Sequence, residues 1–200
     1  ALPELTSDYT PWKDDSGKAY SRFPINSKSI KLTRKIVHPE SFVVFEGVSG
    51  DLKWNIDAQG KLMITGSGEA VDKDEKAEED EEIYPKWHEA SKYIKSCVVD
   101  VSNITDAERL FADLPYLEKI EFKNFDTSKI TNMSYMFYRD YSLKNVDLGA
   151  FDTINVETIY KMFSECNSLK NVDLSNFKTN KVCNMAGMFS KCYSLQNLNL

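Results

Sequence analysis

The 200-residue sequence lacks features that several common classes of protein require. It has no apolar run of 18 or more residues, so no segment is expected to span a membrane as a helix. Its net charge is −6, and no basic face indicates nucleic-acid binding. Its four cysteines are too few for a disulfide scaffold, and none forms the C-x-x-C pair typical of zinc sites.

Histidine is equally scarce, which weakens any enzymatic interpretation. Only His38 and His88 occur, in segments with different expected structure. No serine or cysteine stands at a recognisable motif spacing from a base. Residues 66–68 are too short for a phosphate-binding loop and lack its lysine. We therefore expect no enzyme, no catalytic residue, no metal and no cofactor.

What the sequence does contain is an internal repeat with a period of 26 residues. A fixed period of this length is typical of proteins built as stacked repeats. Each unit holds the pattern Leu-x-x-Val-x-Leu-x-x-Phe, as in residues 143–151, which is leucine-rich-repeat spacing with Phe where Asn or Cys often stands. The period is clearest at Phe111, Phe137, Phe163 and Phe189 and at Leu117, Leu143, Leu169 and Leu195.

Two patterns inside each unit predict its local structure. Residues 146–148 alternate apolar and polar, which predicts a short strand. Ile130, Met133 and Met136 are spaced as on one face of a short helix. One strand and one helical turn cannot bury their own apolar faces, whereas stacked copies can. The expected fold class is an α/β solenoid, a leucine-rich-repeat stack of about four 26-residue units over 104–200, preceded by a small mostly-β N-terminal region.

Stacking would place equivalent residues of successive units in columns. Each large apolar side chain buried in this way contributes roughly 1.5–3 kcal/mol. The expected core columns are Phe111/Phe137/Phe163/Phe189, Leu110/Met136/Met162/Met188 and Leu148/Leu174/Leu200.

One phrase is more specific than the repeat spacing. Residues 162–179 read Met-Phe-Ser-Glu-Cys-Asn-Ser-Leu-Lys-Asn-Val-Asp-Leu-Ser-Asn-Phe-Lys-Thr, and residues 136–153, 188–200 and, more loosely, 110–127 follow the same pattern. The phrase resembles the BspA-like leucine-rich repeats of the DUF285 type. This resemblance implies a bacterial protein that is secreted or held at the cell surface, as lipoproteins are, that is often adhesive, and that has no catalytic residues to carry over.

The chain before the repeats divides into three expected segments. Residues 1–28 are polar and turn-rich and predict an extended arm. Residues 29–82 predict a β region with a hairpin and end in the acidic loop 69–82, which carries a charge of −7. In that loop Asp72, Asp74 and Glu78 have part of a calcium-ligand spacing but lack the glycine of an EF-hand.

Residues 83–103 predict a helix followed by a strand, which we interpret as a degenerate capping rung before the repeats of 104–200. In this alignment Cys97 takes the place of Ile120, and Val99 takes the place of Phe122. Among the cysteines, Cys166 and Cys192 are repeat-equivalent and are either a disulfide or two packed free thiols. The resembling repeats carry Cys there as a packing residue, which favours free thiols.

Function is expected on the outward face of the strands. This face carries polar columns of mixed charge and is either a binding surface or a face kept polar for solubility. A tyrosine group near the expected helical side, Tyr135, Tyr138, Tyr141, Tyr160 and Tyr193, is a second candidate surface. The candidate binding residues of the strand face are Glu121, Asp147, Asp173, Asn199, Lys144, Lys170, Asn145 and Asn171.

Three functions remain open from the sequence. The first is a binding or adhesion module, extracellular or at the bacterial cell surface, that recognises a protein or glycan on a host or neighbouring cell. The second is a structural spacer of a larger surface protein, and the third is an enzyme with its site in the N-terminal β region. Because the last strand pattern ends at Leu200, we also expect either a longer parent protein or end-to-end self-association at an uncapped rung.

Overall fold

The computed structural model describes residues 43–71 and 82–200, together with three two-residue strands near the N-terminus. Those strands, β1 (Trp12–Lys13), β2 (Ala19–Tyr20) and β3 (Thr33–Arg34), pair antiparallel in the order β2-β1-β3. The rest of the expected arm over 1–28 lies outside the described residues. So do Asp72, Asp74 and Glu78 of the acidic loop.

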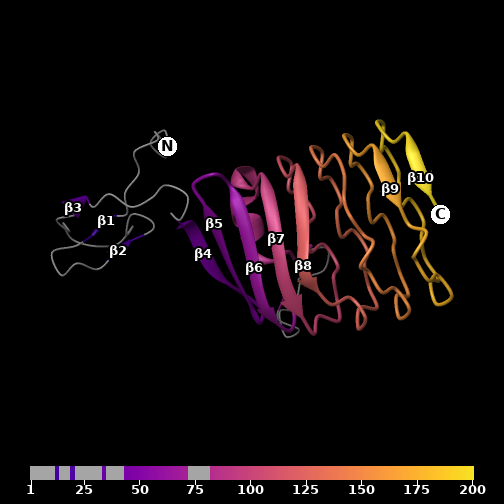
Figure 1. Cartoon of the computed structure of the whole chain (residues 1–200), viewed down its shortest axis with the longest axis horizontal. Coiled ribbons are helices and arrows are strands. Elements are labelled where there is room, and N and C mark those ends of the chain that lie inside the picture. Colours follow the sequence, from indigo (N-terminus) through magenta and orange to yellow (C-terminus); the bar gives the residue numbers. More distant parts are fainter. Residues whose placement is uncertain (1–11, 14–18, 21–32, 35–42, 72–81) are drawn as a thin grey trace.

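From residue 43 onward the chain forms a row of strands that runs from β4 to β10 (Figure 1). β4 (Val43–Ser49), β5 (Leu52–Asp57) and β6 (Lys61–Ser67) are antiparallel neighbours. β7 (Ser96–Ser102) and β8 (Lys119–Phe125) continue the same sheet in parallel. One five-stranded mixed sheet therefore joins the N-terminal β region to the first repeat.

The hairpin between β5 and β6 follows from local chemistry. Alternate residues of β5 are buried, with Leu52 and Ile56 fully inside, which fixes the face that β5 turns to the core. At the turn, Gly60 has a φ of +80°, and a Cβ there would lie 2.3 Å from the carbonyl oxygen of Tyr93. Only glycine fits both the left-handed backbone and this close approach. The hairpin expected in this region is confirmed.

A 3-10 helix, η2 (Lys86–Tyr93), connects β6 to β7 and is interrupted at Ala90. It packs against the inner face of the sheet through Trp87, whose indole N–H donates to the carbonyl oxygen of Leu110 at 3.1 Å. The strand that follows pairs with β8 so that Cys97 faces Ile120 and Val99 faces Phe122. The register expected from the repeat alignment is therefore observed.

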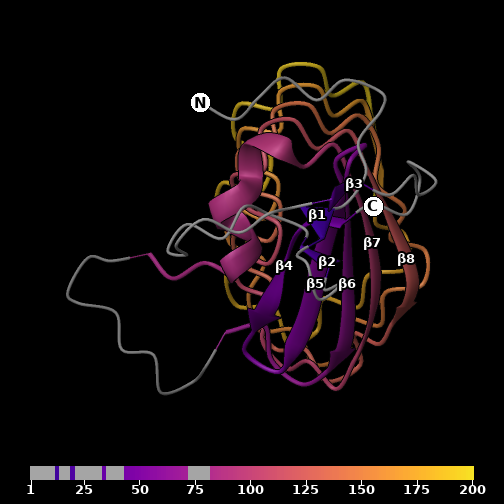
Figure 2. The ribbon, with the colours of Figure 1, turned by 90° about the vertical axis from the view of Figure 1, so that its left-hand side faces the viewer.

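Beyond β8 the units stack as near copies of one another, as Figure 2 shows along the row. β9 (Asn171–Asp173) and β10 (Asn197–Asn199) pair in parallel, one residue opposite its repeat equivalent. A single bridge joins Asn145 to Asn171 in the same register. The division of the chain at 28, 82 and 103 stays a prediction, and the sheet itself runs across the boundaries at 82 and 103.

The expected α/β solenoid is wrong. Among residues 43–71 and 82–200 the structure is mostly β, and its one helix, η2, precedes the repeats. The segments expected to be helical, including Ile130 to Met136, are turns joined to their neighbours by isolated β-bridges.

The helices fail to form because two residues in each unit have a left-handed backbone. An α-helix needs successive φ values near −63°. Here the φ values at the first position lie between +50° and +68° and those at the second between +56° and +66°. The first position is Arg109, Tyr135, Lys161 and Gly187, and the second is Asp113, Arg139, Glu165 and Lys191.

Backbone hydrogen bonds in these turns run between units instead of along a helix. The N–H of Phe137 donates to the carbonyl of Met162 at 2.9 Å, and the N–H of Phe163 donates to that of Met188 at 2.9 Å. The residues between them close local turns, as Met162 does on Ile159 at 3.2 Å. Each unit is thus bound to the next on its turn side as well as on its strand side.

The interior between strands and turns holds the columns expected from the repeat, except that Leu200, expected beside Leu148 and Leu174, is 83% exposed. The rings of Phe137 and Phe163 are parallel with centroids 5.0 Å apart, and those of Phe163 and Phe189 are 5.6 Å apart. Phe111 continues the stack at 5.5 Å from Phe137. Offset or stacked aromatic pairs add to the free energy of burial, so this column stabilises the contact between units.

Candidate functional site

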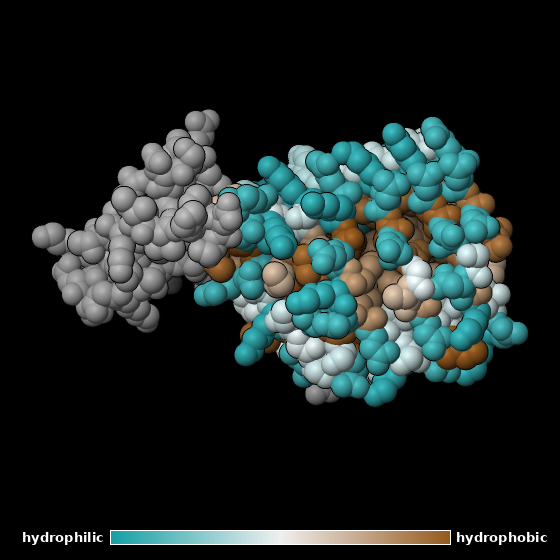
Figure 3. Space-filling view, viewed as in Figure 1, coloured by the Kyte–Doolittle hydropathy of each residue, from teal (hydrophilic) through white to brown (hydrophobic). Residues whose placement is uncertain are grey.

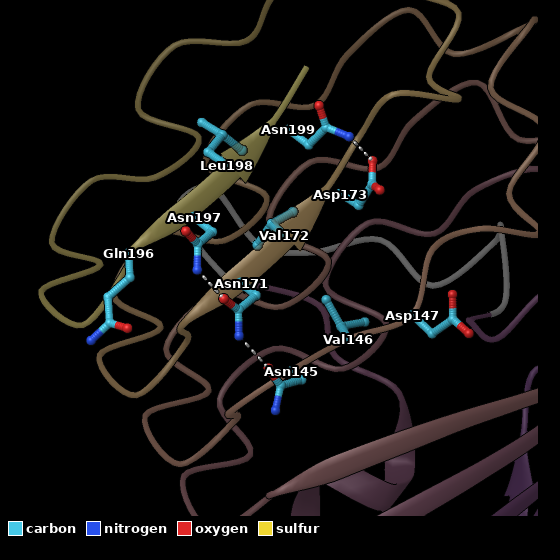
Figure 4. Close-up of a pocket in the computed structure, with 10 residues that line it drawn as sticks. All are labelled: Asn145, Val146, Asp147, Asn171, Val172, Asp173, Gln196, Asn197, Leu198 and Asn199. Atoms are coloured by element: carbon cyan, nitrogen blue, oxygen red, sulfur yellow. Dashed lines mark hydrogen bonds between the residues drawn. The ribbon is translucent and has the colours of Figure 1, made fainter.

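The outward face of the strands is hollowed near β9 and β10 by a groove of about 640 Å³. Figure 3 shows this face, where apolar side chains lie between rows of hydrophilic ones. Figure 4 shows the groove with its lining residues. These residues are Asn145, Val146, Asp147, Asn171, Val172, Asp173, Gln196, Asn197, Leu198 and Asn199.

The period of two in each strand explains which side chains line the groove. Val172 is buried with 3% of its surface exposed, so its neighbours Asn171 and Asp173 point outward. The same alternation in the preceding unit buries Val146 and exposes Asn145. Parallel pairing in register then places equivalent outward residues side by side on successive strands.

The asparagines form a hydrogen-bonded ladder across three units (Figure 4). Nδ2 of Asn171 donates to Oδ1 of Asn145 at 3.1 Å, and Nδ2 of Asn197 donates to Oδ1 of Asn171 at 2.6 Å. A primary amide has two N–H donors and an oxygen with two lone pairs. The ladder uses one donor and one lone pair of Asn171, which leaves one of each for a ligand.

Each aspartate of the groove also shapes its own strand end. Oδ1 of Asp147 accepts the N–H of Gly149 at 2.9 Å, and Oδ1 of Asp173 accepts the N–H of Ser175 at 2.9 Å. Such a bond to the backbone two residues on is a turn that ends the strand. Together with its bond to the Ser175 hydroxyl, which is the largest cause, this lowers the pKa of Asp173. The carboxylate of Asp173 is thus charged at neutral pH, and both carboxylates are partly used by the fold.

The structure brings together five of the eight predicted binding residues: Asn145, Asp147, Asn171, Asp173 and Asn199. The other three, Lys144, Lys170 and Glu121, do not line the groove.

Each of these three lies elsewhere on the strand side. Lys144 forms an ion pair with Glu118 at 2.7 Å, and Lys170 is exposed on the adjacent column. Glu121 lies on β8, opposite Val98 of β7 in the five-stranded sheet. Gln196 and Asn197, which also line the groove, belong to the same outward columns as the chosen residues but were not among the candidate binding residues.

The tyrosine surface lies on the turn side, away from the groove. The guanidinium of Arg109 lies 4.3 Å from the ring centroid of Tyr135, and that of Arg139 lies 4.7 Å from the centroid of Tyr138. These rings already have cations against their faces. Only Tyr193, 78% exposed, is largely open to solvent. This surface therefore offers less unused bonding capacity than the groove.

Two observations concern the histidines and the metal-ligand side chains of the described residues. His88 is half-buried and stacks on Tyr84 with ring centroids 4.2 Å apart, and burial lowers its pKa. His38 lies outside the described residues. Residues 43–71 and 82–200 hold no group of three or more His, Cys, Asp or Glu side chains placed to share a metal ion. In the same part of the chain no helix is long and apolar enough to cross a bilayer.

Comparison with known protein families matches residues 84–199 to a family described as a Mycoplasma protein of unknown function, DUF285. The match extends from just before η2 to the end of β10 and includes every residue of the groove. The chain belongs to the DUF285 family. The resemblance read from residues 162–179 is thereby confirmed.

Two solved structures are also similar to this DUF285 protein, each with a TM-score of 0.41. One is a leucine-rich repeat protein of T. pallidum, 17% identical, where the similarity covers 75% of this chain and 69% of that one. The other is a leucine-rich cell surface protein of Faecalibacterium prausnitzii, 16% identical, with 78% and 42% covered. No curated protein matches the DUF285 chain.

Proposed function

We propose that this DUF285 protein is a non-enzymatic module, secreted or held at a bacterial cell surface, that binds a protein or glycan through the groove of its strand face. The observation that carries the proposal is the set of polar groups there that the fold leaves unused. Oδ2 of Asp147 and Oδ2 of Asp173 have no hydrogen bond within the described residues, and the amides of the asparagine ladder keep unused donors and acceptors.

The stack supports this role because it holds these groups in place before a ligand arrives. The columns beneath the groove include the fully buried Phe137 and Phe163, and Val172 lies directly between the outward Asn171 and Asp173. Preorganised groups lose less conformational entropy on binding, which increases affinity. A spacer would need the stiff stack but not a groove with unused polar groups. The spacer is therefore the second candidate.

The proposal is tested by screening the purified chain against extracellular-matrix proteins and a glycan array. The decisive variant is the double substitution Asp147→Asn and Asp173→Asn, which keeps the oxygen that ends each strand but removes both charges. Hydrogen bonds to charged groups contribute about 1.5–3 kcal/mol each. We therefore expect at least a tenfold loss of affinity for any ligand of the groove.

A matched control lies in the first and second units, next to or within those of the groove aspartates. Oδ1 of Asp126 accepts the N–H of Ser128 at 3.0 Å, and Oδ1 of Asp152 accepts that of Ile154 at 3.2 Å, so both form similar turns outside the groove. The double substitution Asp126→Asn and Asp152→Asn should leave binding unchanged. Equal losses in both variants, or none in either, would move the site away from the groove.

A further inference from the structure

We infer that the ligand of the groove is an uncharged, extended glycan of equatorially 1,4-linked hexoses that lies along the stack, across β9 and β10. This inference rests on the proposed binding function and narrows it to one chemical class. It depends on three properties of the groove: the spacing of its polar groups, their bonding capacity and their charge.

The spacing is set by the stack. Neighbouring parallel strands lie about 4.8 Å apart, and the phenylalanine rings inside this stack repeat at 5.0 to 5.6 Å. Asn145, Asn171 and Asn197 repeat at the same interval because they are paired in register. A ligand that lies along the stack meets the same amide once per unit. Its own repeat must be close to this length, or to a whole multiple of it, to stay in step with the ladder.

An extended peptide does not meet this condition. Its residues rise by about 3.3–3.4 Å, and like groups recur every second residue, at roughly 6.7 Å. After two units a peptide along the stack is out of step with the ladder. A hexopyranose linked equatorially through carbons 1 and 4 advances its chain by about one strand spacing, and successive rings are turned over, so like groups recur after about two spacings. Such a glycan brings one sugar to each amide and the same ring edge to every second amide, so it stays in step with the ladder over all three units.

The bonding capacity of the lining suits hydroxyl groups. Asn171 has one N–H and one oxygen lone pair left after its ladder bonds, and a sugar hydroxyl both donates and accepts. Beside it, Oδ2 of Asp173 accepts only, which suits a neighbouring hydroxyl as donor.

The charge of the groove argues against polyanionic ligands. Its lining holds Asp147 and Asp173 and no cationic side chain. Of the two nearby lysines, Lys144 is already paired with Glu118. A uronic-acid or sulfated glycan would meet two carboxylates at close range, and like charges repel. An uncharged sugar avoids this cost and still bonds to both.

The test is a length series of β-1,4-linked glucose oligosaccharides, from the disaccharide to the hexasaccharide, titrated into the whole chain by calorimetry. We expect affinity to rise by roughly five- to tenfold for each sugar that reaches another unit of the ladder, and then to level off. The α-1,4-linked series of equal length is the control, because its coiled chain leaves the register. It should bind at least tenfold more weakly.

Two variants place the glycan on the ladder. Asn171→Ala removes the central amide and should abolish the rise of affinity with oligosaccharide length. Asn145→Ala removes the amide at one end of the ladder, so affinity should level off at an oligosaccharide one sugar shorter. Both side chains are exposed, so the fold is expected to persist. Asn155→Ala, outside the groove, removes an amide that bonds to the carbonyl of Ser128 at 2.9 Å and should leave the length series unchanged.

The outcomes separate this inference from the proposed function. If a protein binds and is lost in the Asp147→Asn and Asp173→Asn variant while no β-1,4 glycan binds, the glycan inference is wrong and the groove remains a binding site. If affinity does not depend on length, or if both linkages bind equally, the register argument is wrong. If nothing binds the groove at all, the proposed function and the inference are both overturned.

Discussion

The backbone N–H of Leu114 donates to Oδ1 of Asp140 at 3.0 Å, and both residues are fully buried. They occupy the same position of consecutive units, which Cys166 and Cys192 fill in the next two. Oδ2 of Asp140 has no partner among the described residues. Burial raises the pKa of Asp140 well above its usual value, the hydrogen bond from Leu114 opposes this, and nearby Asp113 adds to it.

Asp140→Asn is expected to stabilise the protein at neutral pH. The folded-state pKa of Asp140 exceeds the unfolded value of about 3.9, so its favourable contribution is present below about pH 4 and is lost as pH rises toward the folded pKa. Asparagine has the same shape and cannot ionise. The gain should therefore appear above about pH 4 and increase by up to about 1.4 kcal/mol per pH unit. Urea unfolding over a pH series measures it.

Asp126 provides a control, because its pKa is shifted in the opposite direction from that of Asp140. It is exposed, and its bonds from the hydroxyl and the N–H of Ser128 lower its pKa. Its contribution is present above the unfolded pKa and is lost as pH falls toward the folded pKa. Asp126→Asn should thus give no gain at neutral pH. A free energy of unfolding for Asp140→Asn that parallels the wild type at every pH would show that Asp140 ionises freely in the fold.

The two cysteines of the same column are free thiols. Sγ of Cys166 donates to the carbonyl of Phe137 at 2.9 Å, and Sγ of Cys192 donates to that of Phe163 at 3.0 Å. The thiols thus repeat one contact in successive units. The sequence leaves open either a disulfide between Cys166 and Cys192 or two packed free thiols, and the structure has the free thiols.

Thiol labelling should follow burial. The thiolate is the reactive form, and burial raises the pKa of Cys97 and of Cys166. We expect a thiol reagent to label the exposed Cys183 first, the half-buried Cys192 more slowly, and the other two only on unfolding. Denatured, unreduced protein should show all four thiols. A count of two would show that Cys166 and Cys192 are oxidised to a disulfide.

The stacking could be predicted from sequence because burial repeats with the chain. A residue that must pack on its equivalent in the next unit has to be apolar in every unit, as Phe137 and Phe163 are. The pairing of Cys97 with Ile120 followed from the same alignment. These contacts depend only on which residues are apolar and at what interval, and both are visible in the sequence.

The turns could not be predicted in this way. Apolar residues three and four apart fit a helix, and they fit two successive turns equally well. The turns depend on left-handed residues, and at the first such position the chain has Arg109, Tyr135 and Lys161, none of which favours that conformation. Only Gly187 at the same position signals it. Arg109, Tyr135 and Lys161 keep the left-handed conformation because their backbone N–H groups bond to the next unit. The sequence of a single unit does not reveal these bonds.

The outward columns that line the groove could be predicted from the sequence. The role of the groove aspartates in ending their strands was not predicted. Asp147 stands two residues before Gly149, and Asp173 two before Ser175, a spacing typical of turns that a side chain caps. Glu121 holds the same repeat position with a longer side chain, and β8 continues past it to Phe125. The change from Glu to Asp therefore marks where strands become short.

Phe163 is expected to be far more costly to truncate than Phe189 at the end of the column. Its ring lies between those of Phe137 and Phe189 and is fully buried. Phe163→Ala should cost about 3–5 kcal/mol of unfolding free energy, the range for buried phenylalanine. Phe189→Ala removes a ring that is only partly buried, so it should cost clearly less. Equal losses in denaturant unfolding would contradict a stack in which burial sets stability.

Thr153 bonds one unit to the next through a single hydroxyl. The residue is 1% exposed, and its Oγ1 accepts the N–H of Lys178 at 2.7 Å and donates to the carbonyl of Lys178 at 3.3 Å. In the preceding unit Thr127 forms the same pair of bonds with Asp152, at 2.7 and 3.1 Å. Thr153→Val keeps the shape of the side chain and leaves the N–H of Lys178 without its partner. Such a loss costs about 1–3 kcal/mol.

Thr179→Val is the matched control, because Thr179 has the same repeat position but is exposed. Both substitutions change the β-propensity and the unfolded chain alike, so the difference between them reports the bond between units. We expect Thr153→Val to lower the free energy of unfolding by at least about 1 kcal/mol more than Thr179→Val does. If the two variants unfold at the same denaturant concentration, the hydroxyl adds nothing, and the coupling between units must come from the apolar columns and the backbone bonds of the turns.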